Sequence, residues 1–261
     1  MKRPDLAIPL GAAVGLAAIC VGAWMEGVRL GFLWQPAAAL IVFGGTVGAV
    51  LVRRGTAGLG AILRGIASLF FDAGKEEIEA TKARLTWLAR LERREGAQAL
   101  EAQATMTNDP LIAQSLTMIS QYSDAHLVRE RLERILDHED ERGLRDVMTL
   151  EGAASYAPTF GIVGAVLGLI QALRVLAEPA QLGVGIATAF VATIYGVGIA
   201  NLILFPLAAR LRERHNNHMR QREAIAEALV ALAAHETPSA ITRNFTADME
   251  LTLQKEKAYL R

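Results

Sequence analysis

The chain has 261 residues with 27 basic and 27 acidic side chains, and this zero net charge excludes nucleic-acid binding driven by overall positive charge. Hydrophobic residues make up 52% of the chain and charged residues only 21%, a balance that argues against a purely soluble protein. The single cysteine, Cys20, excludes an intramolecular disulfide and a cysteine metal cluster.

Two apolar runs near the N-terminus, at about residues 6–25 and 34–52, contain no charged side chain. Each is long enough to cross the ~30 Å core of a bilayer as a helix. The first run is longer than the core of a signal peptide and is followed by the second, so we expect a retained helix. Trp24 and Trp34 lie on the two sides of the break, where interfacial tryptophans are expected. These features predict a first transmembrane hairpin over residues 1–54.

The next segment, residues 55–150, is predicted to form a helical cytoplasmic domain. Apolar side chains recur in it at helical spacing, and Asn108, Asp109 and Pro110 break it into at least two parts. Residues 127–146 are dense in charges of both signs, which is typical of a solvated helix with weak ion pairs. A partner-binding surface is the sharper alternative, and charge density alone does not establish it.

A second pair of apolar runs predicts a second transmembrane hairpin over residues 151–209, with helices at about 155–175 and 183–209. Small residues recur in both runs at intervals of three or four, which places them on one face of each helix. Because such stripes mark close backbone approach in lipid, they imply packing against each other or against a partner helix. The stripes comprise Ala157, Gly161, Gly164, Gly168 and Ala172, and then Gly185, Ala189, Thr193, Gly196 and Ala200.

Two prolines and one hydroxyl stand out in this second hairpin. Pro158 lies in the first turns of the first helix and Pro206 near the end of the second, and each removes a backbone hydrogen bond and invites a bend. Thr193 is the one hydroxyl on the small-residue stripe of the second helix. The simplest expectation is that it donates to a backbone carbonyl one turn earlier, with ion contact as the alternative.

The remaining residues, 210–261, are predicted to form a cytoplasmic C-terminal helix and tail. Basic residues gather on one side of the predicted hairpins, and by the positive-inside rule this side, with both termini, is cytoplasmic. The sequence therefore predicts an all-α, polytopic membrane protein in contact with lipid, with four transmembrane helices in two hairpins and a helical cytoplasmic domain. The basic residues are Lys2, Arg3, Arg53, Arg54, Arg210, Arg212 and Arg214.

The chain carries no recognisable catalytic motif: it has neither a nucleotide-binding loop nor a nucleophile motif. His215 and His218 are three residues apart, but two imidazoles are weak evidence for a metal site, and a surface pair explains them more simply. We therefore expect no catalytic residue, no metal and no cofactor, and classify the chain as a non-enzyme. Ionisable groups are also absent from the four apolar runs, so any carboxylate that titrates during ion translocation has to come from a partner helix.

Three segments together resemble the MotA/PomA family of flagellar motor stator proteins, in the MotA/TolQ/ExbB proton channel superfamily. They are WQPAAALIVFGGTVGAVLV in the first hairpin, and APTFGIVGAVLGLI and GIATAFVATIYGVGIANLILFPLA in the second. The resemblance implies an ion-conducting subunit of the bacterial inner membrane that forms a homo-oligomer, a pentamer, around a peptidoglycan-anchored partner of the MotB/PomB type. Ion flow past an aspartate of that partner would turn the ring, whose cytoplasmic loop would push on the rotor protein FliG.

The resemblance also carries roles for individual positions. The two functional prolines of the family match Pro158 and Pro206, and its ion-path threonine matches Thr193. In the cytoplasmic segment the family has an arginine three residues before a glycine and a glutamate five after it, which here are Arg93 and Glu101. Their implied role is electrostatic contact with the rotor; the alternatives are a solvent-facing helix surface and, for the arginine, the adjacent Arg94.

The same comparison bears on the transported ion. Sodium-driven members have a threonine on the third helix at the position of Ala165, and often another directly before the position of Thr193, where this chain has Ala192. A hydroxyl supplies an oxygen ligand to a dehydrating Na⁺, whereas a proton relay to a carboxylate does not need one. Because both positions are alanine, H⁺ is favoured over Na⁺.

Three other readings share parts of this pattern. The ExbB/TolQ energisers of outer-membrane transport share the third and fourth helices, but generally have three membrane helices and an outside N-terminus. A non-conducting membrane scaffold would also need small-residue stripes for packing. A defence motor of the ZorA type shares the core but carries a much longer cytoplasmic tail.

Overall fold

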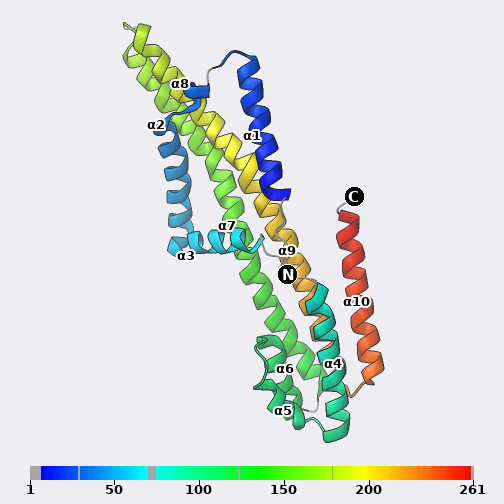
Figure 1. The fold of residues 1–261 in the computed structure, drawn as a ribbon. Coiled ribbons are helices and arrows are strands. Elements are labelled where there is room, and N and C mark those ends of the chain that lie inside the picture. Colours follow the sequence, from blue (N-terminus) through cyan, green and yellow to red (C-terminus); the bar gives the residue numbers. More distant parts are fainter. Residues whose placement is uncertain (1–6, 29, 70–74, 123, 178, 260–261) are drawn as a thin grey trace. The chain divides into compact units, whose positions relative to one another are not determined.

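The computed structural model describes residues 7–28, 30–69, 75–122, 124–177 and 179–259, and the regular structure in this part of the chain is entirely helical (Figure 1). The chain divides into two compact units. Unit 1 consists mainly of Arg3–Asp72 and Leu144–Arg212, and unit 2 of Ala73–Gly143 and Glu213–Arg261. The predicted all-α class is therefore confirmed for the described residues.

Unit 1 begins with α1 (Ala7–Met25) and the short 3₁₀ helix η1 (Leu30–Leu33). A continuous helical stretch then runs through α2 (Pro36–Ala39), the π-helical turn η2 (Leu40–Gly44) and α3 (Gly45–Leu69). The unit is completed by part of α7 (Ala125–Arg174), by α8 (Pro179–Ile199), by the π-helical turn η3 (Ala200–Leu204) and by the first residues of α9 (Phe205–Ala233).

Among the described residues, three helical stretches are long and apolar enough to cross a membrane: Pro36–Leu69, Ala125–Arg174 and Leu182–Ala233. A shorter apolar helix covers Pro9–Met25. The helix predicted at 155–175 is thus the last part of a 50-residue helix, α7, which continues without a break through Pro158 and through the predicted domain boundary at residue 150.

The end of the second predicted span is marked by a glycine rather than by the end of a helix. Gly55 has φ 61° and ψ −164°, a conformation that a side chain would strain, and the helix axis changes there. In Figure 1 the chain turns sharply within α3. The second half of α3 packs through Leu69 against Leu150 of α7 and Leu207 of α9, so the residues just after the span fold back onto unit 1.

Both π-helical turns lie close to a proline. Pro206 is the second residue of α9 and follows η3 directly. Because proline has no N–H, the carbonyl four residues earlier, at Leu202 inside η3, loses its α-helical donor, and a wider turn accommodates the change. Pro36 starts α2, where a missing N–H costs nothing, four residues before η2.

Unit 2 contains α4 (Lys75–Glu95), α5 (Ala99–Ala104), α6 (Pro110–Gln121), the first part of α7, most of α9 and α10 (Pro238–Tyr259). As the sequence predicts, the segment breaks before Pro110: Asp109 caps α6, and its carboxylate accepts from the N–H of Leu111 at 2.9 Å. The core is a leucine-rich cluster from all six helices. Its fully buried members include Leu88, Leu100, Leu111, Leu116, Leu132, Leu229 and Leu232.

Candidate functional site

In unit 1, α7 and α8 touch through their backbones along the two predicted stripes. A Cβ built on Gly168 would lie 2.6 Å from the nitrogen of Ala189 and 2.7 Å from the carbonyl oxygen of Gly185. One built on Gly196 would lie 2.6 Å from the carbonyl oxygen of Ala157. These distances leave no room for any side chain. The first of the two predicted alternatives is therefore correct, because the stripes pack against each other.

One flank of this helix pair is covered by α2 and η2. Ala38 and Val42 pack against Val191 and Ala192 of α8 in a small buried cluster. The hydroxyl of Tyr195, also on α8, donates to the carbonyl of Leu33 and thereby ties α8 to the start of this stretch. The stretch formed by η1, α2 and η2 thus fixes α8 from the side that carries Ala192.

Thr193 lies on a different side of α8 and its side chain is exposed. Its Oγ1 donates to the carbonyl of Ala189 at 3.3 Å, as expected for a hydroxyl that bonds one turn back. Its Cα lies 3.5 Å from a Cβ built on Gly161, at the point where α7 and α8 cross. The Cα of Pro158 lies 3.1 Å from a Cβ built on Gly196, at the same crossing.

The structure therefore brings two of the predicted membrane residues, Pro158 and Thr193, to one place. Ala165 is half-buried on α7, one turn beyond Gly161. Pro206 is exposed in α9, 13 residues after Thr193, which corresponds to about 20 Å along a helix. It does not join Pro158 and Thr193, and it lies directly after η3.

Sequence reasoning missed two polar features of unit 1. Thr46 is buried and its hydroxyl donates to the carbonyl of Val42, the last turn of η2, at 2.7 Å. The hydroxyl of Thr188 on α8 donates to the carbonyl of Val184 at 2.9 Å and lies 3.4 Å from the Oε1 of Gln35, next to Tyr195. Isolated polar residues inside apolar runs were the available signal, but periodicity does not show which of them meet.

Arginines and acids gather where the apolar part of unit 1 ends. Arg54 donates to the carbonyl of Arg145 at 2.5 Å and to the hydroxyl of Thr149 at 2.6 Å. Arg212 makes a two-pronged pair with Glu151, with Nη2 at 2.9 Å from both oxygens. These contacts connect α3 and α9 to the same stretch of α7.

The two predicted rotor-contacting residues flank a turn in unit 2. Arg93 is exposed in the last turn of α4, and Glu101 is exposed in the first turn of α5. Between them Gly96 has φ 83° and donates its N–H to the carbonyl of Glu92, which ends α4. Arg94 is as exposed as Arg93, so burial does not distinguish the two arginines.

Directly beside Arg93 is a buried carboxylate that sequence reasoning missed. The side chain of Glu92 is 7% exposed, and its Oε1 accepts from Nδ1 of His235 at 2.6 Å. His235 lies in the turn between α9 and α10 and has φ 56°, the one positive φ of a non-glycine residue in the described part of the chain. The contact joins the end of α4 to this turn.

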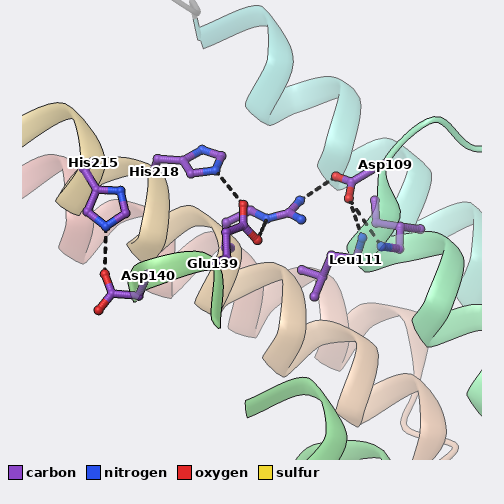
Figure 2. A network of polar contacts seen from close by, with 8 residues as sticks. Asp109, Leu111, Glu139, Asp140, His215 and His218 are labelled. Atoms are coloured by element: carbon purple, nitrogen blue, oxygen red, sulfur yellow. Dashed lines mark hydrogen bonds and ion pairs between the residues drawn. The ribbon is translucent and has the colours of Figure 1, made fainter. Parts of the chain in front are cut away.

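A second polar network links α6, α7 and α9 (Figure 2). Arg222, whose side chain is 10% exposed, donates to Asp109 at 2.6 Å and to Glu139 at 3.2 Å. Asp109 therefore holds both the start of α6 and an arginine of α9. The other oxygen of Glu139 accepts from His218 at 3.0 Å.

His215 and His218 thus meet different carboxylates, with Asp140 accepting from His215 at 2.7 Å (Figure 2). The imidazole of His215 is 9% exposed and lies against Gly143, so the interpretation of both histidines as a surface pair is wrong for His215. Among the described residues no group of three His, Cys, Asp or Glu side chains could hold a metal.

Residues 127–146 are therefore more than a solvated face. Farther along the same helices, Arg129 donates to Glu227 at 2.8 Å, and this hydrogen bond raises the pKa of the arginine above its ordinary value. Both side chains of this pair are about half exposed, so its contribution to stability is small.

Comparison with known proteins identifies relatives over nearly the whole chain. The profile of the Motility protein A N-terminal region matches residues 9–96, and that of the MotA/TolQ/ExbB proton channel family matches residues 103–224. Motility protein A of Treponema phagedenis is 31% identical over 234 residues, which cover 90% of each chain. Motility protein A of Bacillus subtilis is 29% identical over 232 residues, covering 89% of this chain and 86% of the relative.

A solved structure is also similar. It is the flagellar MotAB stator complex from Bacillus subtilis, which matches with a TM-score of 0.75 and 29% identity, over 90% of this chain and 92% of that one.

Proposed function

The chain belongs to the MotA family of the MotA/TolQ/ExbB superfamily and is a stator subunit of the flagellar motor, and we propose that it is proton-driven and converts ion flow past a partner's membrane aspartate into torque. The family is one of ion-channel and stator subunits rather than of enzymes. Its apolar helices and its relatives make it a multi-pass protein of the inner membrane. The finer features of this function follow as parts of the proposal.

For the membrane topology, we propose four spans in two hairpins with both termini in the cytoplasm. The apolar part of α1 would form the first span and the stretch from Pro36 to Gly55 the second. The last part of α7 and the stretch through α8 and η3 would form the third and fourth. The clustering of Arg54 and Arg212 on one stretch of α7 supports a common, cytoplasmic end for three of these helices.

The relative from Bacillus subtilis is a MotAB complex, and we propose a peptidoglycan-anchored partner of the MotB/PomB type and a pentameric ring for this chain. One observation carries this part: α2 and η2 cover one side of the α7–α8 pair, whereas Thr193 and exposed apolar side chains such as Phe190 and Ile162 occupy another. The chain's own apolar runs lack a carboxylate, so the partner would supply it.

For the ion, the position of Ala165 offers no oxygen, and Ala192 is fully buried against η2 and α7. Thr193 has its single proton directed at the carbonyl of Ala189. A dehydrated Na⁺ would therefore find few side-chain ligands here, which supports H⁺.

For the rotor, Arg93 and Glu101 would contact charged groups of FliG. They are exposed on consecutive helices, and in the described part of the chain neither forms an ion pair that would have to be broken first. Electrostatic pairing of this kind sets orientation and rate of encounter more than affinity.

The experiment that tests the function is a clean deletion in the source organism, scored for flagella by microscopy and for swimming while external sodium is varied in the parent. Intact but paralysed flagella, together with parental swimming that is indifferent to sodium, are the expected result. Normal swimming of the deletion strain, when it carries no second stator, would refute the stator role. Sodium-dependent swimming would refute proton drive alone.

A pair of threonines on one helix tests the ion path. Thr193→Val should reduce swimming strongly, whereas Thr188→Val, which removes an equivalent bond to the carbonyl of Val184 and a longer contact with Gln35, should reduce it less. Equal effects would assign Thr193 a packing role only. Membrane levels of both variants, measured by immunoblotting, serve as the control.

A further inference from the structure

Unit 2 contains a groove between α4 and α10 that none of the proposed stator functions uses. Its volume is about 630 Å³, within the range of small-molecule sites. It is lined by two arginines and four hydroxyl-bearing residues, together with a proline and an alanine. The polar lining residues are Arg90, Arg243, Thr86, Ser239, Thr242 and Thr246.

Among the described residues, no carboxylate balances the charge in this groove. None of its lining residues is acidic, and within the described part of the chain neither Arg90 nor Arg243 has an ion-pair or hydrogen-bond partner. This contrasts with Arg129, Arg212 and Arg222 of the same chain, each of which pairs with a carboxylate. Two guanidinium groups that line one groove and remain unpaired are suited to bind an anion, and their planar donors match phosphate.

The hydroxyls add a second, different requirement. Thr86 donates to the carbonyl of Lys82 at 2.8 Å, Thr242 to that of Pro238 at 2.7 Å, and Thr246 to that of Thr242 at 2.8 Å. Thr86 and Thr242 also hydrogen-bond to each other at 2.8 Å across the groove, so one of these two hydroxyls gives its proton to the other instead of to its backbone carbonyl. A hydroxyl has one proton and two lone pairs, so these oxygens have no proton left for a ligand and can only accept.

A fitting ligand therefore combines an anionic group for the arginines with N–H or O–H donors for the threonine oxygens. Inorganic phosphate or pyrophosphate satisfies the first condition, but at neutral pH its only donors are P–OH groups on the same anion that the arginines would bind. A nucleotide satisfies both conditions with separate groups, because its sugar hydroxyls and base amino group are donors. We propose that the groove between α4 and α10 is a nucleotide-binding site, with Arg90 and Arg243 on the phosphates and Thr242 and its neighbours on the sugar or base.

The site has a consequence for the motor that rests on the proposed rotor contact. Arg90 is three residues, about one helical turn, before Arg93 on α4. A bound phosphate would reduce the positive potential at the end of α4 and weaken an electrostatic contact with the rotor. Nucleotide binding would then lower torque rather than power it.

The test measures binding of ATP without magnesium to the full chain, purified with its partner in detergent, by titration calorimetry. Arg90→Ala and Arg243→Ala should each weaken ATP binding by about tenfold, since each removes a charge-assisted contact. Arg94→Ala is the matched control on the same helix, because Arg94 is exposed and lies outside the groove. The ATP affinity of this variant should be unchanged. All three arginines are exposed, so their loss should leave the fold intact.

Pyrophosphate separates the two parts of the proposal. Thr242→Val should weaken ATP binding by about threefold and leave pyrophosphate binding unchanged, since it removes only an acceptor. Equal binding of ATP and pyrophosphate, with no effect of Thr242→Val, would overturn the nucleotide assignment. Absence of ATP binding would also overturn the nucleotide assignment. So would the finding that an acidic peptide, and not ATP, binds in a manner that depends on Arg90. These readouts are binding affinities rather than swimming. The nucleotide proposal can therefore be refuted without refuting the stator function, and the reverse also holds.

Discussion

At the contact between α7 and α8 the two backbones meet directly, and a Cβ built on Gly185 would lie 2.8 Å from the nitrogen of Ala172. In the core of unit 2, leucines such as Leu229 fill the space between helices, and charged pairs such as Arg222 with Glu139 join them at the side. In lipid, apolar side chains gain little by leaving their surroundings, so close backbone contact provides the attraction. In water, burial of leucine provides it. We therefore expect unit 1 to be disrupted most by substitutions that add volume to its helix contact. Unit 2 should be destabilised most by substitutions that remove a packing or hydrogen-bond partner.

The largest effect should come from one methyl group in the α7–α8 contact. Gly196→Ala places its Cβ 2.6 Å from the carbonyl oxygen of Ala157, and because the obstacle is backbone, the helices have to move apart. We expect swimming to be abolished, from overpacking of about 1–3 kcal/mol at a site that also positions Pro158 and Thr193. Swimming in soft agar measures it.

The matched control lies two residues along the same helix. A Cβ at Gly198 would meet nothing within 4 Å, so cells that carry Gly198→Ala should swim normally. If both variants swim alike at equal membrane levels, the backbone contact is not what holds the pair in its working geometry.

The polar side of unit 2 should respond next most strongly. Arg222→Met keeps the apolar stem but leaves Asp109 and Glu139 without their shared donor, and we expect a loss of about 2–3 kcal/mol. Because the two acids are about a third exposed, the loss is smaller than for a fully buried pair. Protease resistance of this segment in membranes, compared at increasing urea concentration, measures it.

Arg129→Met tests the same kind of pair at the surface. Its partner Glu227 is more than half exposed, so the loss should stay below about 1 kcal/mol. A loss as large as that of Arg222→Met would show that burial does not govern the charged pairs of unit 2.

A still smaller effect on the fold, but a clear one on motility, is expected at the exposed end of α4. Arg93→Glu should reduce swimming by about half, and Arg93→Gln less, because reversal adds repulsion from the rotor whereas neutralisation only removes attraction. Arg94→Glu resolves which of the two adjacent arginines acts. Equal effects of Arg93→Glu and Arg93→Gln would indicate packing rather than charge.

The sequence predicted those parts of the molecule that repeat or that follow one another closely. The Gly and Ala stripes of α7 and α8 and the break capped by Asp109 are local patterns, and both are confirmed. The bend at Gly55 was not predicted, since a glycine in an apolar segment is compatible with a straight helix. Neither was the burial of His215 against Gly143, because periodicity shows which residues share a face but not which residues 72 positions apart will meet.

His235 and Glu92 are 143 positions apart and illustrate that limit, and they also give the finest test of how unit 2 holds its exposed end. His235→Ala removes the donor to a buried carboxylate and also leaves a non-glycine residue at φ 56°. We expect it to destabilise unit 2 by about 1–3 kcal/mol and to reduce swimming, because the last turn of α4 carries Arg93. Protease resistance and swimming are measured together.

Two further variants separate the backbone from the side chain at this position. His235→Gly relieves the left-handed conformation but still leaves Glu92 without a donor, so stability should recover in part while swimming stays low. His235→Asn tolerates the same φ and carries an N–H donor, so it should restore both. If the glycine variant swims as well as the asparagine variant, the imidazole does not position α4, and the turn matters only for its backbone. If neither restores swimming, the ring itself makes a contact that an amide cannot replace.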